Sequence, residues 1–195
     1  MPKRISEKTK FTGRIFRIKD VLVRHDNGRE FTYEVMQAVG GTTGAMMVAV
    51  DDAGRVVLVK EYFVGIDKTQ LCLPKGRIDA GEKPADAARR ELEEETGYAA
   101  KRLKLLARVN LSPGYSDQAT YIYLATGLSK PKNPKKGDEV EPLTVVLAPL
   151  AKAVSWVKAG KICEARAVAG LLLAEALLMS AKKKIKEHPQ RRMKE

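Results

Sequence analysis

The stretch that most constrains this chain runs from Gly76 to Tyr98 and reads GRIDAGEKPADAARRELEEETGY. It places Glu91, Glu94 and Glu95 at i, i+3 and i+4, so on a helix their carboxylates share one face. Like charges at this spacing destabilise a helix by about 0.2–0.5 kcal/mol a pair, and here they stand in a chain of net charge +12. A cation bound between the carboxylates would remove that repulsion, so the segment is a candidate metal site.

The residues around the acidic cluster predict where its helix begins and ends. Pro84 suits a first helical turn because its missing N–H has no partner there, and Gly97 suits the position just past the last turn. We therefore expect a helix over Pro84–Thr96, after an approach, residues 75–81, whose glycines let the backbone come close to a ligand. Its apolar stripe, opposite much of the acidic face, consists of Ala85, Ala88 and Leu92.

The first part of the chain predicts a small β-domain. Apolar and polar residues alternate over 31–35, which is typical of a half-buried strand, and Asn27-Gly28 before it is typical of a hairpin turn. A glycine-rich junction at 40–44 indicates a boundary. The expected units are an N-terminal β-domain over 1–43, a main domain over 44–186 and a basic tail over 187–195.

Beyond the junction, short apolar runs are followed by helical segments. Two such runs, 45–50 and 56–59, are joined by a turn and predict a buried hairpin. Because strands and helices mix without strict βαβ alternation, the expected class is α+β with a mixed β-sheet, not a doubly wound parallel sheet. Further strands are expected at 71–73, 103–109, 120–125 and 143–147, and further helices over Leu150–Lys158 and 164–186.

Composition excludes several classes of protein. No apolar run reaches the ~18 residues of a membrane span, and the charged start, MPKRISEKTK, lacks the apolar region of a secretory signal. Cys72 and Cys163 lie far apart without metal-ligand partners, which favours a cytoplasmic protein with free thiols. The basic runs at both ends and at Lys130–Lys136 are interpreted as solvated tails or loops, with attraction of a polyanion as the alternative.

Three carboxylates on one helical face suit a hard divalent cation. Mg²⁺ takes oxygen ligands, commonly one or two carboxylates, and completes its shell with waters and substrate phosphates. Arg90 stands four residues before Glu94 and can pair with it, or reach back to Glu82 and tie the loop to the helix. Such parts suit metal-assisted displacement at phosphorus. The alternative is a surface helix with an acidic face.

The spacing of the segment favours the metal site. It matches the Nudix box at all nine specified positions, namely Gly76, Glu82, Arg90, Glu91, Leu92, Glu94, Glu95, Gly97 and Tyr98. The chain thus resembles the Nudix hydrolases, which cleave a nucleoside diphosphate linked to another moiety. The resemblance implies an α/β/α sandwich with a mixed sheet, and a site that Arg90 and Glu82 orient. The implied metal ligands are Glu91, Glu94, Glu95 and the backbone carbonyl of Lys75.

Outside the box the chain is similar to the ADP-ribose pyrophosphatase group, and most to its ADP compounds hydrolase (NudE-type) branch. Pro113 stands sixteen residues past Gly97, as in that group. The branch resemblance lies in Gly137–Leu143 (GDEVEPL), Glu61-Tyr62 and Glu164-Ala165-Arg166. In the acidic loop, Glu139 is the implied general base, with Glu141 in reserve. Phe63 and Cys72 replace an arginine and a glutamate of strict ADP-ribose pyrophosphatases, which favours the ADP-compound branch.

Four residues are expected to bind substrate, although each has a structural alternative. Tyr62 and Tyr115 can stack on adenine, since stacking is worth ~1–3 kcal/mol per base, but core packing is the more common role. Asp117 can bond a ribose hydroxyl or cap its loop, and Pro113 belongs to the same loop.

The resulting prediction is a Mg²⁺-dependent pyrophosphohydrolase, with Mn²⁺ as an alternative metal. It would cleave ADP-X compounds (ADP-ribose, NADH, diadenosine polyphosphates) to AMP and X-phosphate. The resemblance implies a homodimer in which the N-terminal β-domain closes over the nucleotide, and no membrane partner. The rival functions are hydrolysis of dinucleoside polyphosphates or of an RNA 5′ end, and a nucleotide- or nucleic-acid-binding module with an inactive box. Nucleic acid is the less favoured partner, since binding alone does not require all three glutamates.

Overall fold

The computed structural model describes residues 1–41, 43–135, 137 and 143–187, and side chains as far as residue 181. The predicted helices are confirmed within a residue or two. In chain order the elements are β1 (Lys3–Thr12), β2 (Phe16–Arg24), β3 (Glu30–Ala38), β4 (Thr43–Ala49), β5 (Arg55–Phe63), β6 (Lys68–Cys72), β7 (Lys75–Arg77), α1 (Pro84–Thr96), β8 (Ala99–Asn110), β9 (Ala119–Ser129), β10 (Thr144–Pro149), α2 (Leu150–Lys158) and α3 (Ala165–Glu187).

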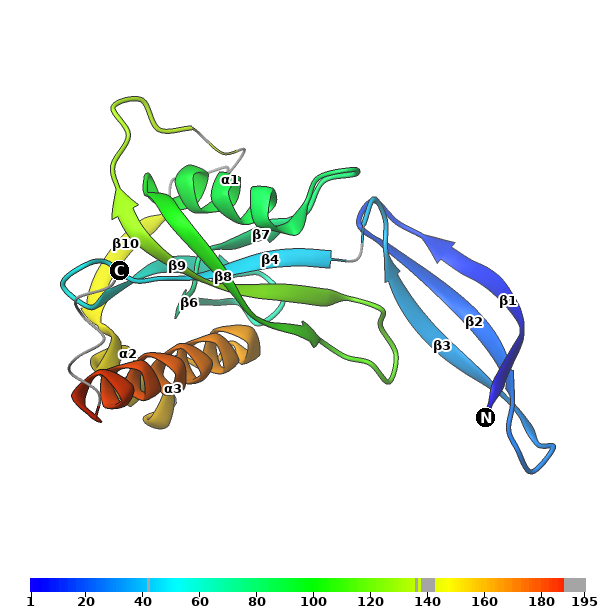
Figure 1. Cartoon of the computed structure of the whole chain (residues 1–195). Coiled ribbons are helices and arrows are strands. Elements are labelled where there is room, and N and C mark those ends of the chain that lie inside the picture. The colour runs from blue at the N-terminus through cyan, green and yellow to red at the C-terminus, as the bar shows by residue number, and fades with distance from the viewer. Residues whose placement is uncertain (42, 136, 138–142, 188–195) are drawn as a thin grey trace.

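The main body is a mixed sheet between helices, as the α+β prediction requires. Its four strands run in the order β7-β4-β9-β8, and β4 pairs with β9 in parallel. Both faces of β4 are buried: Met46 and Val48 pack on the side of α3, whereas Ala45 and Met47 pack on the side of α1. Alternation of side chains along the strand therefore serves two cores at once. Figure 1 shows α1 and α3 on opposite faces of this sheet.

The buried hairpin predicted from the two apolar runs is wrong in its pairing. A turn does join β4 to β5, but the strands share only the isolated bridge Val50–Val56 and then separate into different sheets. β5 lies in the middle of a second sheet, ordered β10-β5-β6. An apolar run indicates that a strand is buried, but it does not indicate which strand pairs with it. The partner of β5 is β10, about ninety residues later in the chain.

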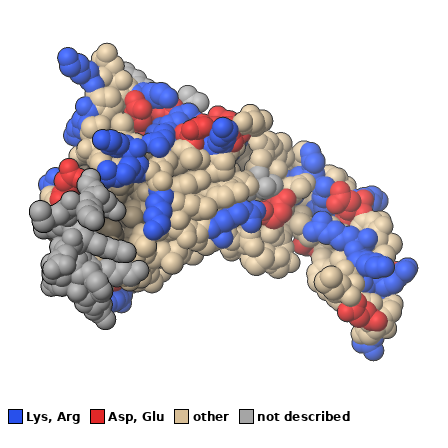
Figure 2. Space-filling view, in the orientation of Figure 1, with Lys and Arg blue, Asp and Glu red and all other residues tan. Residues whose placement is uncertain are grey.

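A separate antiparallel sheet, β1-β2-β3, precedes the main body and projects from it (Figure 1). The sequence did not predict β1, because all ten of its residues are exposed and its charges resemble a solvated tail. On the face shown in Figure 2, acidic side chains are interspersed with Lys and Arg over this sheet. The Met36 N–H donates to the Tyr115 carbonyl at 2.7 Å, so the sheet contacts the loop between β8 and β9.

Helix α3 lies very close to the four-stranded sheet at Gly170. A Cβ added there would stand 3.0 Å from Leu73 Cδ1, 3.1 Å from Val48 Cγ2 and 3.2 Å from Ile122 Cγ2. Such distances leave no room for a methyl group without movement of the core, because interiors are close-packed. Among the residues searched, no helix is both long and apolar enough to cross a membrane.

Candidate active site

Helix α1 carries the acidic cluster and is fixed at both ends by the residues that predicted it. Pro84 occupies its first turn. Gly97 takes a left-handed conformation (φ 71°), and its N–H donates to the Glu93 carbonyl at 2.8 Å. The buried side of the helix consists of Ala87, Ala88, Leu92 and Thr96. Packing that side against the sheet leaves the glutamates at the margin where β7 passes.

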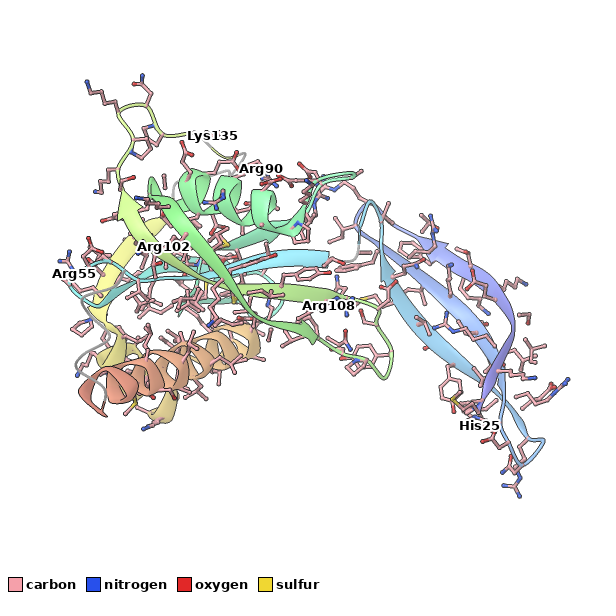
Figure 3. The ribbon with its side chains drawn as sticks, viewed as in Figure 1. His25, Arg55, Arg90, Arg102, Arg108 and Lys135 are labelled. Carbon is pink, nitrogen blue, oxygen red and sulfur yellow. The ribbon has the colours of Figure 1, made fainter. Side chains whose placement is uncertain are left out.

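Arg90 is the centre of the acidic cluster and bonds both the loop and the helix (Figure 3). Its Nε and Nη2 donate to the two carboxylate oxygens of Glu82 at 3.0 and 2.9 Å. Its Nη1 donates to Glu91 at 2.7 Å and Glu94 at 3.0 Å, and Nη2 also reaches the Arg77 carbonyl at 2.9 Å. The bonds from Arg90 hold the pKa of Glu82 below its usual range. Arg90 thus ties the loop before α1 to the acidic face.

The other two contacts of the cluster are with strand β7. Glu95 accepts the Lys75 N–H at 2.9 Å, and burial raises the pKa of the Glu95 carboxyl to about 8. The Glu91 carboxylate occupies the space in front of Gly76, where an added Cβ would lie 1.9 Å from Cδ. Only glycine leaves that space open, which gives the first glycine of the box a steric reason.

A second charged pair lies beside Glu95 and was not predicted from the sequence. The Lys75 ammonium bonds the Glu61 carboxylate and lies 5.1 Å from the centre of the Phe63 ring. The Cys72 thiol lies 3.2 Å from the same carboxylate, and burial raises its pKa to about 12, so it stays a neutral thiol. In the sequence, Glu61 stood out only as part of the Glu61-Tyr62 pair, and the spacing of residues along the chain does not indicate which groups the Glu61 side chain faces.

The Glu61–Lys75 pair and Glu95 face a cavity of about 380 Å³, which lies between the main body and the N-terminal sheet. Glu61, Lys75, Gly76 and Glu95 line one side of it, and Arg166 from the first turn of α3 lies among the lining residues. Residues of the N-terminal segment, the strand start at Thr43 and the beginning of β9 complete the wall. The cavity therefore brings together cations and carboxylates from four separate stretches of the chain, namely β5, β7, α1 and α3.

The donor set fits a hard divalent cation. Glu91, Glu94 and Glu95 offer carboxylate oxygens, and the missing side chain of Gly76 makes room for the carboxylate of Glu91. Within the described residues, no three acidic, histidine or cysteine side chains already form a cluster that could hold an ion. Arg90 bonds two of the carboxylates and the Lys75 N–H bonds the third. A cation bound here would share or replace those contacts.

The predicted substrate-binding residues lie outside this cavity. Tyr62 is exposed and donates its hydroxyl to Asp67 at 2.6 Å. Pro113, Tyr115 and Asp117 line a different hollow, between their loop and the N-terminal sheet. Asp117 there accepts a bond from the side chain of Gln37 at 3.1 Å. Tyr62 and Tyr115 are both exposed, so neither packs in the core, and the predicted roles of the four residues in substrate binding stay predictions.

The predicted general bases cannot be placed. Glu139 and Glu141 both lie outside the residues that the structure describes. Their roles therefore stay predictions.

Comparison with known proteins gives consistent results. Residues 41–169 match the family model of the NUDIX domain. The chain is 36% identical to an ADP-ribose pyrophosphatase of Mycobacterium tuberculosis over 89% of its own length and 83% of the relative's. It is 33% identical to the ADP compounds hydrolase NudE of Escherichia coli, over 91% of this chain and 93% of that one. A crystal structure of an ADP compounds hydrolase superposes with a TM-score of 0.84 at 32% identity, covering 92% of this chain and 95% of that one.

Proposed function

The chain belongs to the NUDIX domain family, and on that premise we propose that it is a Mg²⁺-dependent pyrophosphohydrolase of ADP-X compounds. The proposed products are AMP and X-phosphate, with ADP-ribose, NADH and diadenosine polyphosphates as the candidate substrates. The names of the two relatives and of the similar structure support this substrate class. The observation that carries the proposal is the half-buried Glu95 carboxyl group, which accepts the Lys75 N–H and lines the cavity.

The proposed metal ligands are Glu91, Glu94, Glu95 and the carbonyl oxygen of Lys75, with Mn²⁺ as an alternative to Mg²⁺. Bound there, the cation would neutralise phosphate oxygens and make an attacking water more acidic. Arg90 and Glu82 orient the carboxylates through their paired bonds, and loss of such supporting contacts commonly lowers activity as much as 10- to 100-fold. Glu139 is the proposed general base, with Glu141 as the alternative.

The proposed assembly is a homodimer formed through the N-terminal sheet. Phe11 and Phe31 are each 61% exposed, and Ile5 is also exposed on this sheet. Exposed apolar side chains gathered on one small sheet are typical of an interaction surface. The proposed division of the chain, 1–43, 44–186 and a basic tail 187–195, assigns dimerisation and closure over the nucleotide to the first unit. Free thiols support a cytoplasmic location.

The proposal is tested by incubating the protein with ADP-ribose, NADH and diadenosine triphosphate, each with and without Mg²⁺. Release of AMP that requires the metal supports it, and the ratio of kcat/KM values ranks the X groups. Absence of AMP from all three substrates, with a folded protein and both Mg²⁺ and Mn²⁺ supplied, would refute the assigned activity.

A further inference from the structure

A fixed arginine stands at the start of α3, in a segment to which the proposed chemistry gives no role. The Nε of Arg166 donates to Glu164 Oε1 at 2.6 Å, and the other oxygen, Oε2, accepts the Ala167 N–H at 2.8 Å. The side chains of Arg166 and Glu164 are only 23% and 14% exposed. One carboxylate therefore both caps the helix and orients the guanidinium.

Arg166 lies at the boundary of two hollows. One is the cavity of the candidate site, and the other, of about 490 Å³, lies against the turn between β5 and β6. Glu61 and Arg166 are the two residues that line both hollows, and Glu164 lines the second. A molecule that occupied both hollows would have to pass these two side chains.

The terminal nitrogens of Arg166 are the groups best suited to an anion there. Lys75, the nearby cation on β7, is already paired with Glu61. The described part of the chain offers the Arg166 Nη atoms no hydrogen-bond acceptor, since Glu164 engages Nε alone. A guanidinium presents a planar pair of N–H groups that matches two phosphate oxygens at once, and its charge persists at any physiological pH.

We propose that Arg166 binds the diphosphate of the substrate where it passes between the two hollows, and that Glu164 is its positioning residue. The inference rests on the proposed hydrolysis of ADP-X compounds. A diphosphate with one organic group at each end needs a cation between two cavities, and Arg166 occupies that position. The helix end is not itself the binding site, because Glu164 already fills it.

Three substitutions separate substrate binding from a purely structural ion pair. Arg166→Ala removes the guanidinium, and Arg166→Lys keeps the positive charge without the planar pair of N–H groups. Glu164→Gln keeps an oxygen for the Ala167 N–H but removes the charge that holds Arg166. Arg102→Ala is the matched control, since Arg102 lies at the far end of the sheet (Figure 3) and, among the residues that the structure describes, its side chain donates to Thr126 alone, at 3.4 Å.

Each protein is assayed for AMP release with Mg²⁺ and for calorimetric binding of α,β-methylene-ADP, a diphosphate that is not cleaved. Arg166→Ala is expected to raise KM and the Kd of the analogue about ten- to hundredfold, the range for bonds to charged groups. Arg166→Lys and Glu164→Gln should lie between it and the unaltered chain, with the protein still folded at the assay temperature and a kcat within about threefold. Arg102→Ala should match the unaltered chain.

The two proposals fail in different ways. If the unaltered chain releases AMP but Arg166→Ala and Arg166→Lys keep its KM and Kd, the diphosphate assignment is overturned and the activity stands. A loss confined to kcat also overturns it. If no AMP is released but the analogue binds and Arg166→Ala weakens that binding, the hydrolysis proposal fails and the assignment stands. If the folded chain neither cleaves nor binds, both are overturned.

Discussion

Gly76→Ala offers the most direct test of the site, because the structure gives the collision atom by atom. The new Cβ would stand 1.9 Å from Glu91 Cδ and 2.1 and 2.3 Å from its two oxygens. Carbon atoms in contact prefer 3.5–4.0 Å, so the carboxylate must retreat by about 1.5–2 Å. A misplacement of 1 Å in a catalytic group can lower the rate about 100-fold, so we expect kcat/KM to fall by roughly that factor or more.

Folding should be affected much less than activity. Gly76 has an ordinary backbone conformation for an L-residue, and the colliding atoms belong to the end of a side chain that can rotate. Replacing glycine by alanine at a compatible position stabilises a protein by about 0.4–1 kcal/mol through the unfolded chain. Loss of the Arg90–Glu91 hydrogen bond has the opposite effect, of about 1.5–3 kcal/mol, the range for bonds to charged groups. The free energy of unfolding should therefore fall by about 0.5–2.6 kcal/mol, which leaves the protein folded at the assay temperature.

The assay compares AMP release and urea unfolding for Gly76→Ala and for Gly114→Ala, whose Cβ would meet nothing within 4 Å. If the loss of activity comes from this collision, the effects of Gly76→Ala and Glu91→Ala on activity should not add. In a Glu91→Ala background the collision disappears, so Gly76→Ala should cause little further loss. Full activity in the single variant, or an equal added loss in both backgrounds, would refute the explanation.

Three further predictions concern single carboxylates. Glu95→Gln should lower kcat by orders of magnitude at an unchanged fold by circular dichroism, since it removes a proposed ligand; retained activity would exclude that role. Glu82 has a pKa below its ordinary 4.5 because Arg90 donates to it, so its carboxylate stabilises the fold above about pH 4.5 and loses this effect as pH falls through the lowered value. The stability difference between the unaltered chain and Glu82→Gln, from urea unfolding, should therefore be constant near neutral pH and shrink in acid; a pH-independent difference would contradict it. Glu139→Gln should lower the rate more than the affinity for Mg²⁺ measured by calorimetry, and an unchanged rate would move the base to Glu141.

Local features of the sequence predicted the elements that local chemistry determines. Pro84 and Gly97 gave the ends of α1 because a missing N–H and a left-handed residue suit those positions and few others. The spacing of Arg90 from Glu82 and Glu94 likewise predicted contacts that the structure contains, since both depend on one helix and the loop before it. Such relations are set within about fifteen residues of chain.

Relations between distant segments were not predictable in this way. The hairpin prediction was wrong because β5 pairs with β10, far along the chain, and not with β4. Strand β1 escaped notice because pairing with β2 satisfies its backbone while burying none of its side chains. Glu61 and Arg166 stood out in the sequence only as parts of the branch resemblance, because their common position at the cavity depends on β5 and α3, which lie about one hundred residues apart in the chain.

The close approach at Gly170 reaches further than the core in which it lies. Gly170 and Arg166 stand four residues apart, hence on the same side of α3 one turn from each other. A larger residue at 170 would press on the core and push this turn of α3 away from the sheet. The Arg166 guanidinium would move with it, so a substitution in the interior is expected to alter the wall of the cavity.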